Sequence, residues 1–109
     1  MENTAHLLHL QQRVADFVAA HDLAAPVESR LLDLVSEVGE AAKEALKGSD
    51  YGRRTFQPTT AWTEELGDVL FSLACVANST GVDLAAALET ALAKYERRLA
   101  QQGEAGSEH

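Results

Sequence analysis

Residues 64–77 read Glu-Glu-Leu-Gly-Asp-Val-Leu-Phe-Ser-Leu-Ala-Cys-Val-Ala, and this stretch decides how the chain folds. Over residues 69–77 only Ser72 is polar, and a helix that is apolar on nearly every side is a buried helix. Just before this run, Glu65 and Asp68 stand three residues apart, so a helix brings both carboxylates to one face. The stretch therefore predicts a core helix with two charges at the edge of the core, where unpaired charge is costly.

A second pair of carboxylates, Glu37 and Glu40, has the same spacing in an earlier helical segment. Carboxylate oxygens are hard ligands, and Mg²⁺ accepts a few of them while keeping waters and phosphate oxygens in its shell. We therefore expect the two helices to bind Mg²⁺, with Mn²⁺ as a substitute. A di-iron site needs Glu-x-x-His motifs, and a zinc site needs histidine or cysteine ligands. No histidine stands near either acidic pair in the sequence, and the set of histidine and cysteine ligands that zinc needs is lacking.

The rest of the sequence predicts three further helices and no strand. Apolar residues recur at helical spacing, and Pro26, Gly48 and Gly81 mark the breaks between segments. The four helices are expected at residues 4–21, 26–47, 59–79 and, after a cap at Asp83, to about residue 99. The fold class is therefore all-α, a four-helix bundle-like domain over residues 1–100. The polar, glycine-rich residues 101–109 are typical of a disordered tail.

The apolar surface of the third helix exceeds what three neighbours in a small chain cover, which predicts that a second copy completes the core. We expect a homodimer or a dimer of dimers. The second helix should also bury one apolar stripe, made of Leu31, Leu34, Val35, Val38, Ala42 and Ala45.

Composition limits the class of partner and the compartment. A net charge of −8 and a pI near 4.8 argue against binding to nucleic acid. No apolar run approaches the ~20 residues of a membrane span, and no apolar segment of a signal peptide follows Met1. Cys75 is the single cysteine, so no disulfide can form within the chain, which favours a reducing, cytoplasmic setting.

The acidic motifs and their surroundings resemble the MazG family of all-α nucleoside triphosphate pyrophosphohydrolases. The resemblance covers about residues 7–99 and rests on four segments in the family's order. They are LDLVSEVGEAAKEA at 32–45, EELGDVLFSLACVAN at 64–78, GVDLAAAL at 81–88 and KYERRL at 94–99. The chain departs from the family's pattern at Ser36, where a glutamate usually precedes Glu37.

The resemblance implies hydrolysis of a nucleoside triphosphate to the monophosphate and pyrophosphate, with Mg²⁺ on the phosphates and a role in removing non-canonical nucleotides. It assigns metal binding and catalysis to Glu37, Glu40, Glu65 and Asp68. Phosphate contacts are implied for Lys94 and Arg98. Two alternatives stay open, a phosphoribosyl-ATP pyrophosphohydrolase and a non-catalytic helical module that binds partners through its third helix.

Recognition of the nucleoside is implied at Asn78. Some relatives also place an aromatic residue soon after the first acidic motif, where it stacks on the base. Residues 45–47 here are Ala-Leu-Lys, so Trp62 is the candidate for stacking, with plain packing as its alternative.

Overall fold

The structure is a computed structural model that describes residues 2–102, with side chains from His6 onward. It contains four helices in chain order and no strand among these residues. They are α1 (Glu2–Ala20), α2 (Val27–Gly48), α3 (Thr60–Ser79) and α4 (Leu84–Gln102). The all-α prediction is confirmed. Because α4 continues through Gln102, two residues expected in the tail are helical, and the remainder of that tail lies outside the described residues.

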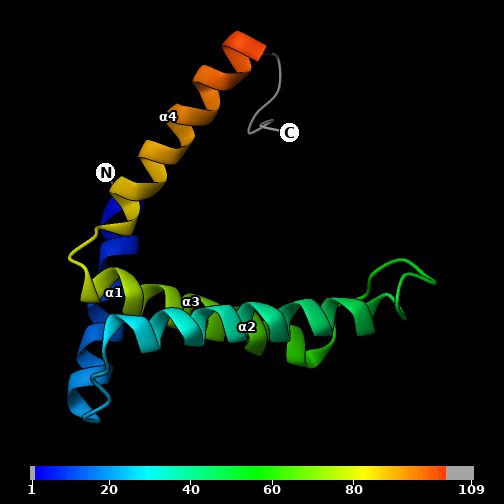
Figure 1. Cartoon of the computed structure of the whole chain (residues 1–109), viewed down its shortest axis with the longest axis horizontal. Coiled ribbons are helices and arrows are strands. Elements are labelled where there is room, and N and C mark those ends of the chain that lie inside the picture. The colour runs from blue at the N-terminus through cyan, green and yellow to red at the C-terminus, as the bar shows by residue number, and fades with distance from the viewer. Residues whose placement is uncertain (1, 103–109) are drawn as a thin grey trace.

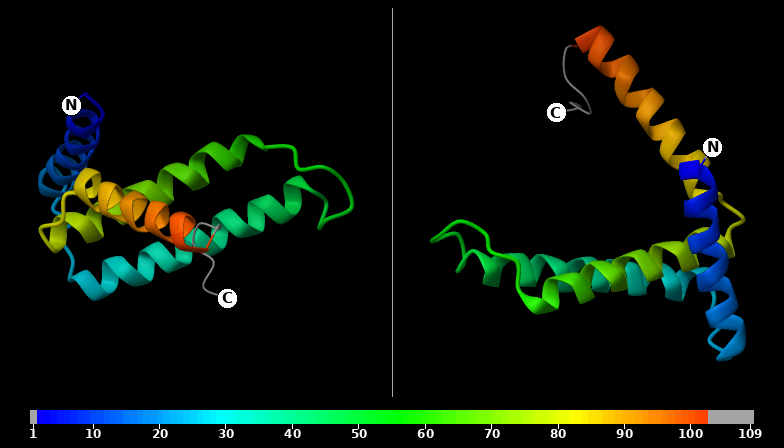
Figure 2. Two further views of the ribbon diagram at one scale, coloured as in Figure 1. Left: turned by 90° about the horizontal axis from the view of Figure 1, so that it is seen from above. Right: turned by 180° about the vertical axis from the view of Figure 1, so that it is seen from behind.

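Helices α2 and α3 lie side by side as a long hairpin, and they form the main packing of the chain (Figures 1 and 2). On α2 the side that is at least half-buried recurs at Leu34, Glu37, Ala41 and Glu44, one helical face. The predicted buried stripe is therefore partly wrong, since Val35 is 65% exposed and its neighbours Leu31 and Val38 are exposed too. The face of α2 that is turned toward α3 lies beside the predicted stripe. It carries acidic residues as well as small and apolar ones.

Helix α3 is buried on one side only. Its buried residues are Ser72, Ala74, Cys75 and Ala77. On the other side, Leu66, Leu70 and Leu73 are exposed. The prediction that α3 is buried on nearly every side is therefore wrong within a single chain, because α1 and α2 cover only part of its circumference.

The connection from α2 to α3, residues 49–59, folds back sharply onto the end of α2. A Cβ atom at Gly48 would lie 2.6 Å from Phe56 Cε1 and 2.7 Å from the carbonyl oxygen of Gln57, so only glycine fits there. The Gln57 amide donates to the Gly48 carbonyl at 2.9 Å. Phe56 in turn meets Trp62 edge to face, with ring centroids 5.3 Å apart. This packing fixes where α3 begins.

At the other end of the hairpin, α1 crosses it and α4 departs from it (Figure 2). Gln11 of α1, only 5% exposed, holds this junction. Its Nε2 donates to Asn78 Oδ1 at 3.1 Å and to the Val82 carbonyl at 2.9 Å, while its Oε1 accepts from the Leu84 amide at 2.8 Å. Asn78 Nδ2 donates back to the Gln11 carbonyl at 3.0 Å. One buried amide thus fixes the direction in which α4 leaves.

Helix α4 packs mainly on α1 and projects away from the hairpin, so the four helices of one chain do not close into a bundle (Figure 1). Its apolar stripe is consequently bare, with Leu88, Leu92, Tyr95 and Leu99 all exposed. No single helix among residues 2–102 has the length and apolarity to cross a membrane, although α3 and α4 together, bent by 100°, meet that test by length and composition alone.

Candidate functional site

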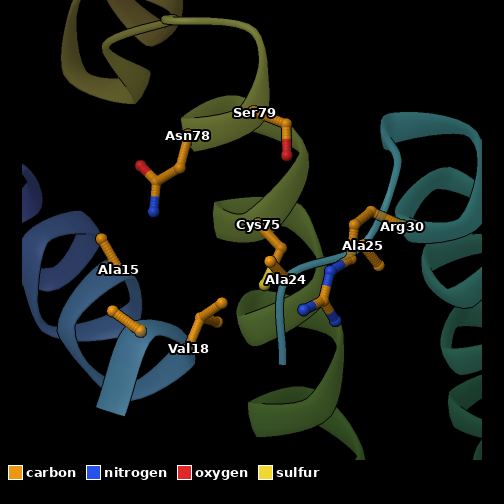
Figure 3. Close-up of a pocket in the computed structure, with 9 residues that line it drawn as sticks. Ala15, Val18, Ala24, Ala25, Arg30, Cys75, Asn78 and Ser79 are labelled. Carbon is orange, nitrogen blue, oxygen red and sulfur yellow. The ribbon is translucent and has the colours of Figure 1, made fainter. Parts of the chain in front are cut away.

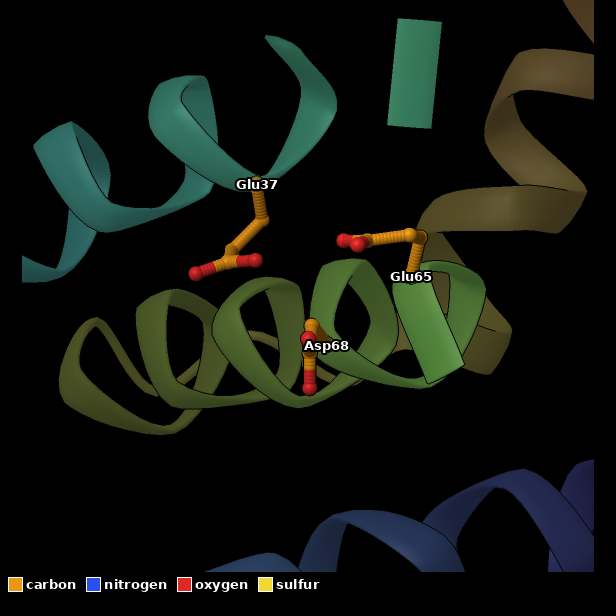
Figure 4. Close-up of side chains that lie close together, drawn as sticks. All are labelled: Glu37, Glu65 and Asp68. Atoms are coloured by element: carbon orange, nitrogen blue, oxygen red, sulfur yellow. The ribbon is translucent and has the colours of Figure 1, made fainter. Parts of the chain in front are cut away.

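Three carboxylates converge between the two helices of the hairpin. Glu37 comes from α2, and Glu65 and Asp68 come from α3 (Figure 4). One oxygen of each lies within 4.8 Å of the others. Glu37 and Glu65 are half-buried, whereas Asp68 is exposed. The position expected at the edge of the core is found for half-buried Glu65, whereas Asp68 is solvent-exposed in a single chain.

Local sequence explains the convergence. The i,i+3 spacing places Glu65 and Asp68 on one face of α3, and the hairpin sets that face against the Glu37 face of α2. Glu40, expected as the fourth ligand, is exposed, and it is not one of the three residues whose oxygens converge. Its charge nevertheless reaches Glu65, so Glu40 flanks the site.

The electrostatics of the site are one-sided. Desolvation raises the pKa of Glu65, and the negative charges of Asp68, Glu40, Glu37 and Glu44 raise it further, in that order. Among the described residues, no ion pair involves Glu37, Glu40, Glu65 or Asp68. Within the described part of the chain, the cluster thus holds negative charge with no cationic side chain paired to it.

This donor set fits a hard divalent cation. Mg²⁺ binds oxygen ligands at about 2.1 Å, so opposed ligand oxygens in its shell lie about 4.2 Å apart. Oxygens already within 4.8 Å need only small side-chain rotations to reach that spacing. Carboxylates without nitrogen or sulfur donors favour Mg²⁺ or Mn²⁺ over zinc.

The other residues predicted from sequence lie apart from the three carboxylates within one chain. Asn78 is ten residues beyond Asp68 on the same helix, and its amide is engaged with Gln11. Lys94 and Arg98 are on the projecting α4, where Lys94 Nζ lies 5.3 Å from the centre of the Tyr95 ring. The roles implied for these residues remain predictions.

Trp62 is nearer, one turn before Glu65, and it is half-buried against Phe56. The packing alternative left open by the sequence is therefore observed. Stacking of Trp62 on a base remains a prediction.

Glu44 is a residue of the site region that the sequence analysis did not assign. Its side chain is 13% exposed, it accepts a hydrogen bond from Thr59 Oγ1 at 3.0 Å, and it pairs with Lys47 at 3.4 Å. The available signal was its position seven residues after Glu37, which is two helical turns and hence the same face.

A separate cavity of about 260 Å³ lies between α1, α2 and α3, roughly two turns along the hairpin from the carboxylates (Figure 3). Alanines, Val18, Arg30 and Cys75 form much of its wall. Burial raises the pKa of the Cys75 thiol, which keeps it protonated and a poor nucleophile. Because the lining has no carboxylate, this cavity does not compete with the acidic cluster as a metal centre.

Known proteins resemble this chain in sequence and in structure. The uncharacterized protein YpjD of Bacillus subtilis (strain 168) is 37% identical over 68 residues, a match that spans 60% of this chain and 60% of YpjD. The crystal structure of YpjD from Bacillus subtilis, a candidate pyrophosphatase, superposes with a TM-score of 0.66 and 30% identity over 84% of this chain and 94% of that one. The family model of the MazG nucleotide pyrophosphohydrolase domain matches residues 26–101, which include all three converging carboxylates. The chain belongs to this MazG nucleotide pyrophosphohydrolase family.

Proposed function

We propose that the protein is a Mg²⁺-dependent hydrolase that cleaves a (deoxy)nucleoside triphosphate to the monophosphate and pyrophosphate. The observation that carries the proposal is the convergence of Glu37, Glu65 and Asp68 without an ion-pair partner among the residues whose side chains are described. Glu37, Glu40, Glu65 and Asp68 alone would repel a triphosphate, so a site of this kind needs a cation to bind that substrate. The physiological role proposed is removal of non-canonical nucleotides.

In this mechanism Glu37, Glu65 and Asp68 hold the cation, and Glu40 stands at its edge. When bound there, Mg²⁺ would screen the charge of the phosphates and make a water molecule easier to deprotonate. A carboxylate oxygen outside the metal shell accepts the proton of the attacking water. The water oxygen would form a new bond to a phosphorus atom of the α–β anhydride while the bond from that phosphorus to the bridging oxygen breaks, which gives the monophosphate and pyrophosphate.

We propose further that the working protein is a homodimer or a dimer of dimers in the cytoplasm. The support is the bare apolar surface on α2, α3 and α4, which a second copy of the chain can cover. Lys94 and Arg98 lie on α4, which projects away from the α2–α3 hairpin. In our proposal they contact phosphates only after two copies of the chain have assembled. Trp62 and Asn78 are proposed to contact the nucleoside.

The test is a panel of triphosphates, deoxynucleoside triphosphates, modified nucleotides and phosphoribosyl-ATP, assayed for both monophosphate and pyrophosphate. We expect pyrophosphate release with Mg²⁺ or Mn²⁺, none after chelation, and none from the Asp68→Asn variant. Full turnover after exhaustive chelation would contradict the metal requirement. Cleavage of phosphoribosyl-ATP alone would favour the first alternative, and no cleavage of any substrate would favour a non-catalytic module.

A further inference from the structure

Glu44 differs from the other carboxylates on the inner face of α2 because both of its oxygens are engaged. Thr59 Oγ1 donates to Oε1 at 3.0 Å, and Lys47 Nζ lies 3.4 Å from Oε2. The Glu44 side chain is mostly covered, whereas that of Lys47 reaches into solvent. Glu44 therefore has a compensated charge and a fixed position, while Glu37, two turns earlier on the same face, has no ion-pair partner among the described residues.

Thr59 is equally unusual for its place in the chain. It is the N-cap residue of α3 and has the extended backbone of a cap, with φ −93° and ψ 171°, yet its side chain does not cap the helix. A threonine hydroxyl that accepts from the first turn is worth about 1 kcal/mol. Here the hydroxyl donates across the hairpin to Glu44 instead. The position gives up a local bond for one between the two helices.

This bond acts close to the carboxylate site. Its acceptor, Glu44, lies one turn after Glu40 on α2, and its donor, Thr59, lies six residues before Glu65. Among the residues with described side chains, it is the one side-chain hydrogen bond that joins α2 to the start of α3. The contacts of Gly48 with Phe56 and Gln57 hold the loop, and the Glu44–Thr59 bond adds a direct link between the N-cap of α3 and α2.

We infer that Glu44 and Thr59 are positioning residues that set the separation of α2 and α3 so that Glu65 faces Glu37 for cation binding. The inference rests on the proposed function, because it assumes that the three converging carboxylates hold the cation. Neither positioning residue contacts the metal. The contrary assignment makes Glu44 a direct ligand, which its two occupied oxygens and its absence from the converging group argue against.

The test titrates Mn²⁺ into the protein and follows free Mn²⁺ by electron paramagnetic resonance, which needs no turnover. We expect Thr59→Val to weaken Mn²⁺ binding by about tenfold, the lower end of what outer-shell changes cause at metal sites. Thr59→Ser restores the hydroxyl and should bind Mn²⁺ as the parent does. Thr60→Val is the matched control, since Thr60 is exposed and its side chain has no described partner. Glu44→Gln keeps an oxygen that can accept from Thr59, so we expect a smaller loss than for Thr59→Val.

If the parent binds Mn²⁺ and releases pyrophosphate, the proposed function stands. Two outcomes would then contradict only the inference about Glu44 and Thr59. In one, Thr59→Val binds Mn²⁺ as tightly as the parent. In the other, Glu44→Gln loses far more affinity than Thr59→Val, which would make Glu44 a ligand. A parent that binds no Mn²⁺ contradicts the proposed function as well. Titrations are made well below the lowest unfolding midpoint, and Thr59→Ala gives the same comparison should the valine variant not fold.

Discussion

At the scale of single residues, the pKa of Glu65 depends on whether the hairpin is folded and whether a cation is bound. In the unfolded chain, Glu65 is a solvated carboxylate with an ordinary pKa. Folding desolvates it and brings four other carboxylates within electrostatic reach, which raises its pKa. The folded state then binds the proton more tightly than the unfolded state, so metal-free stability falls as pH rises through the raised pKa.

We therefore predict that Glu65→Gln raises the unfolding midpoint of the chelated protein near pH 7. The increase should shrink as pH falls toward about 4, where an ordinary glutamate is also protonated and the two proteins converge. Melting curves between pH 4 and pH 8 measure this. The matched control is Glu64→Gln at the exposed neighbouring position. An increase that does not depend on pH would argue against a charge effect. With Mg²⁺ present the order should reverse, because the parent gains stability from a ligand that the variant binds poorly.

At the scale of helices, sequence predicts where an element begins and ends better than which face it buries. Pro26, Gly48 and Asp83 mark the boundaries correctly, and Asp83 Oδ1 accepts from the Ala85 amide at 2.9 Å as a cap should. Such signals depend on adjacent residues alone. The buried face of α2 depends on what packs against it, and periodicity alone selected the stripe around Val35, which is exposed.

The site shows the same division between local and long-range information. The spacing of Glu65 and Asp68 on one helix was readable from sequence, and so was the second acidic pair. That Glu37 meets them while Glu40 flanks them depends on the register of two helices, which the loop and the Gly48 contact set. The roles of Gln11 and Glu44 depend on partners 67 and 15 residues away, beyond any local pattern.

The junction of α1, α3 and α4 gives a prediction at this scale. Gln11→Ala leaves Asn78 Oδ1 and the Leu84 amide without their partner, and should cost about 1–3 kcal/mol of unfolding free energy. Asn78→Ala should cost a similar amount. Because the two side chains share one network, the double variant should lose clearly less than the sum. Urea unfolding of the four proteins measures the coupling, and strictly additive losses would contradict the network.

The same pair of variants separates structure from recognition. If Asn78 also contacts the nucleoside, Asn78→Ala should raise KM for the triphosphate beyond any change seen with Gln11→Ala. Equal kinetic effects would leave Asn78 with a structural role alone.

At the scale of the whole molecule, the single chain leaves much of its apolar surface uncovered. Its buried apolar residues are mainly alanines and Cys75, whereas leucines on α2, α3 and α4 are exposed. Monomeric proteins rarely expose large contiguous apolar patches, and such patches commonly mark interfaces. The projecting α4 also keeps Lys94 and Arg98 away from the acidic cluster of the same chain. The proposed phosphate contacts therefore require the proposed association of two copies.

The stripe on α4 offers a direct test of that assembly. Leu92 is 44% exposed in the middle of the stripe, and Thr90 lies on the opposite side of the same helix. Glutamate at position 92 places a charge where a second copy would bury it, and an unpaired buried charge is strongly unfavourable. Light scattering at micromolar concentration should therefore give a dimer or tetramer for the parent, and a smaller species for Leu92→Glu. Thr90→Glu adds the same charge on the other face and should keep the parent's mass. A parent that is monomeric at this concentration, or two variants that behave alike, would contradict an interface on this face of α4.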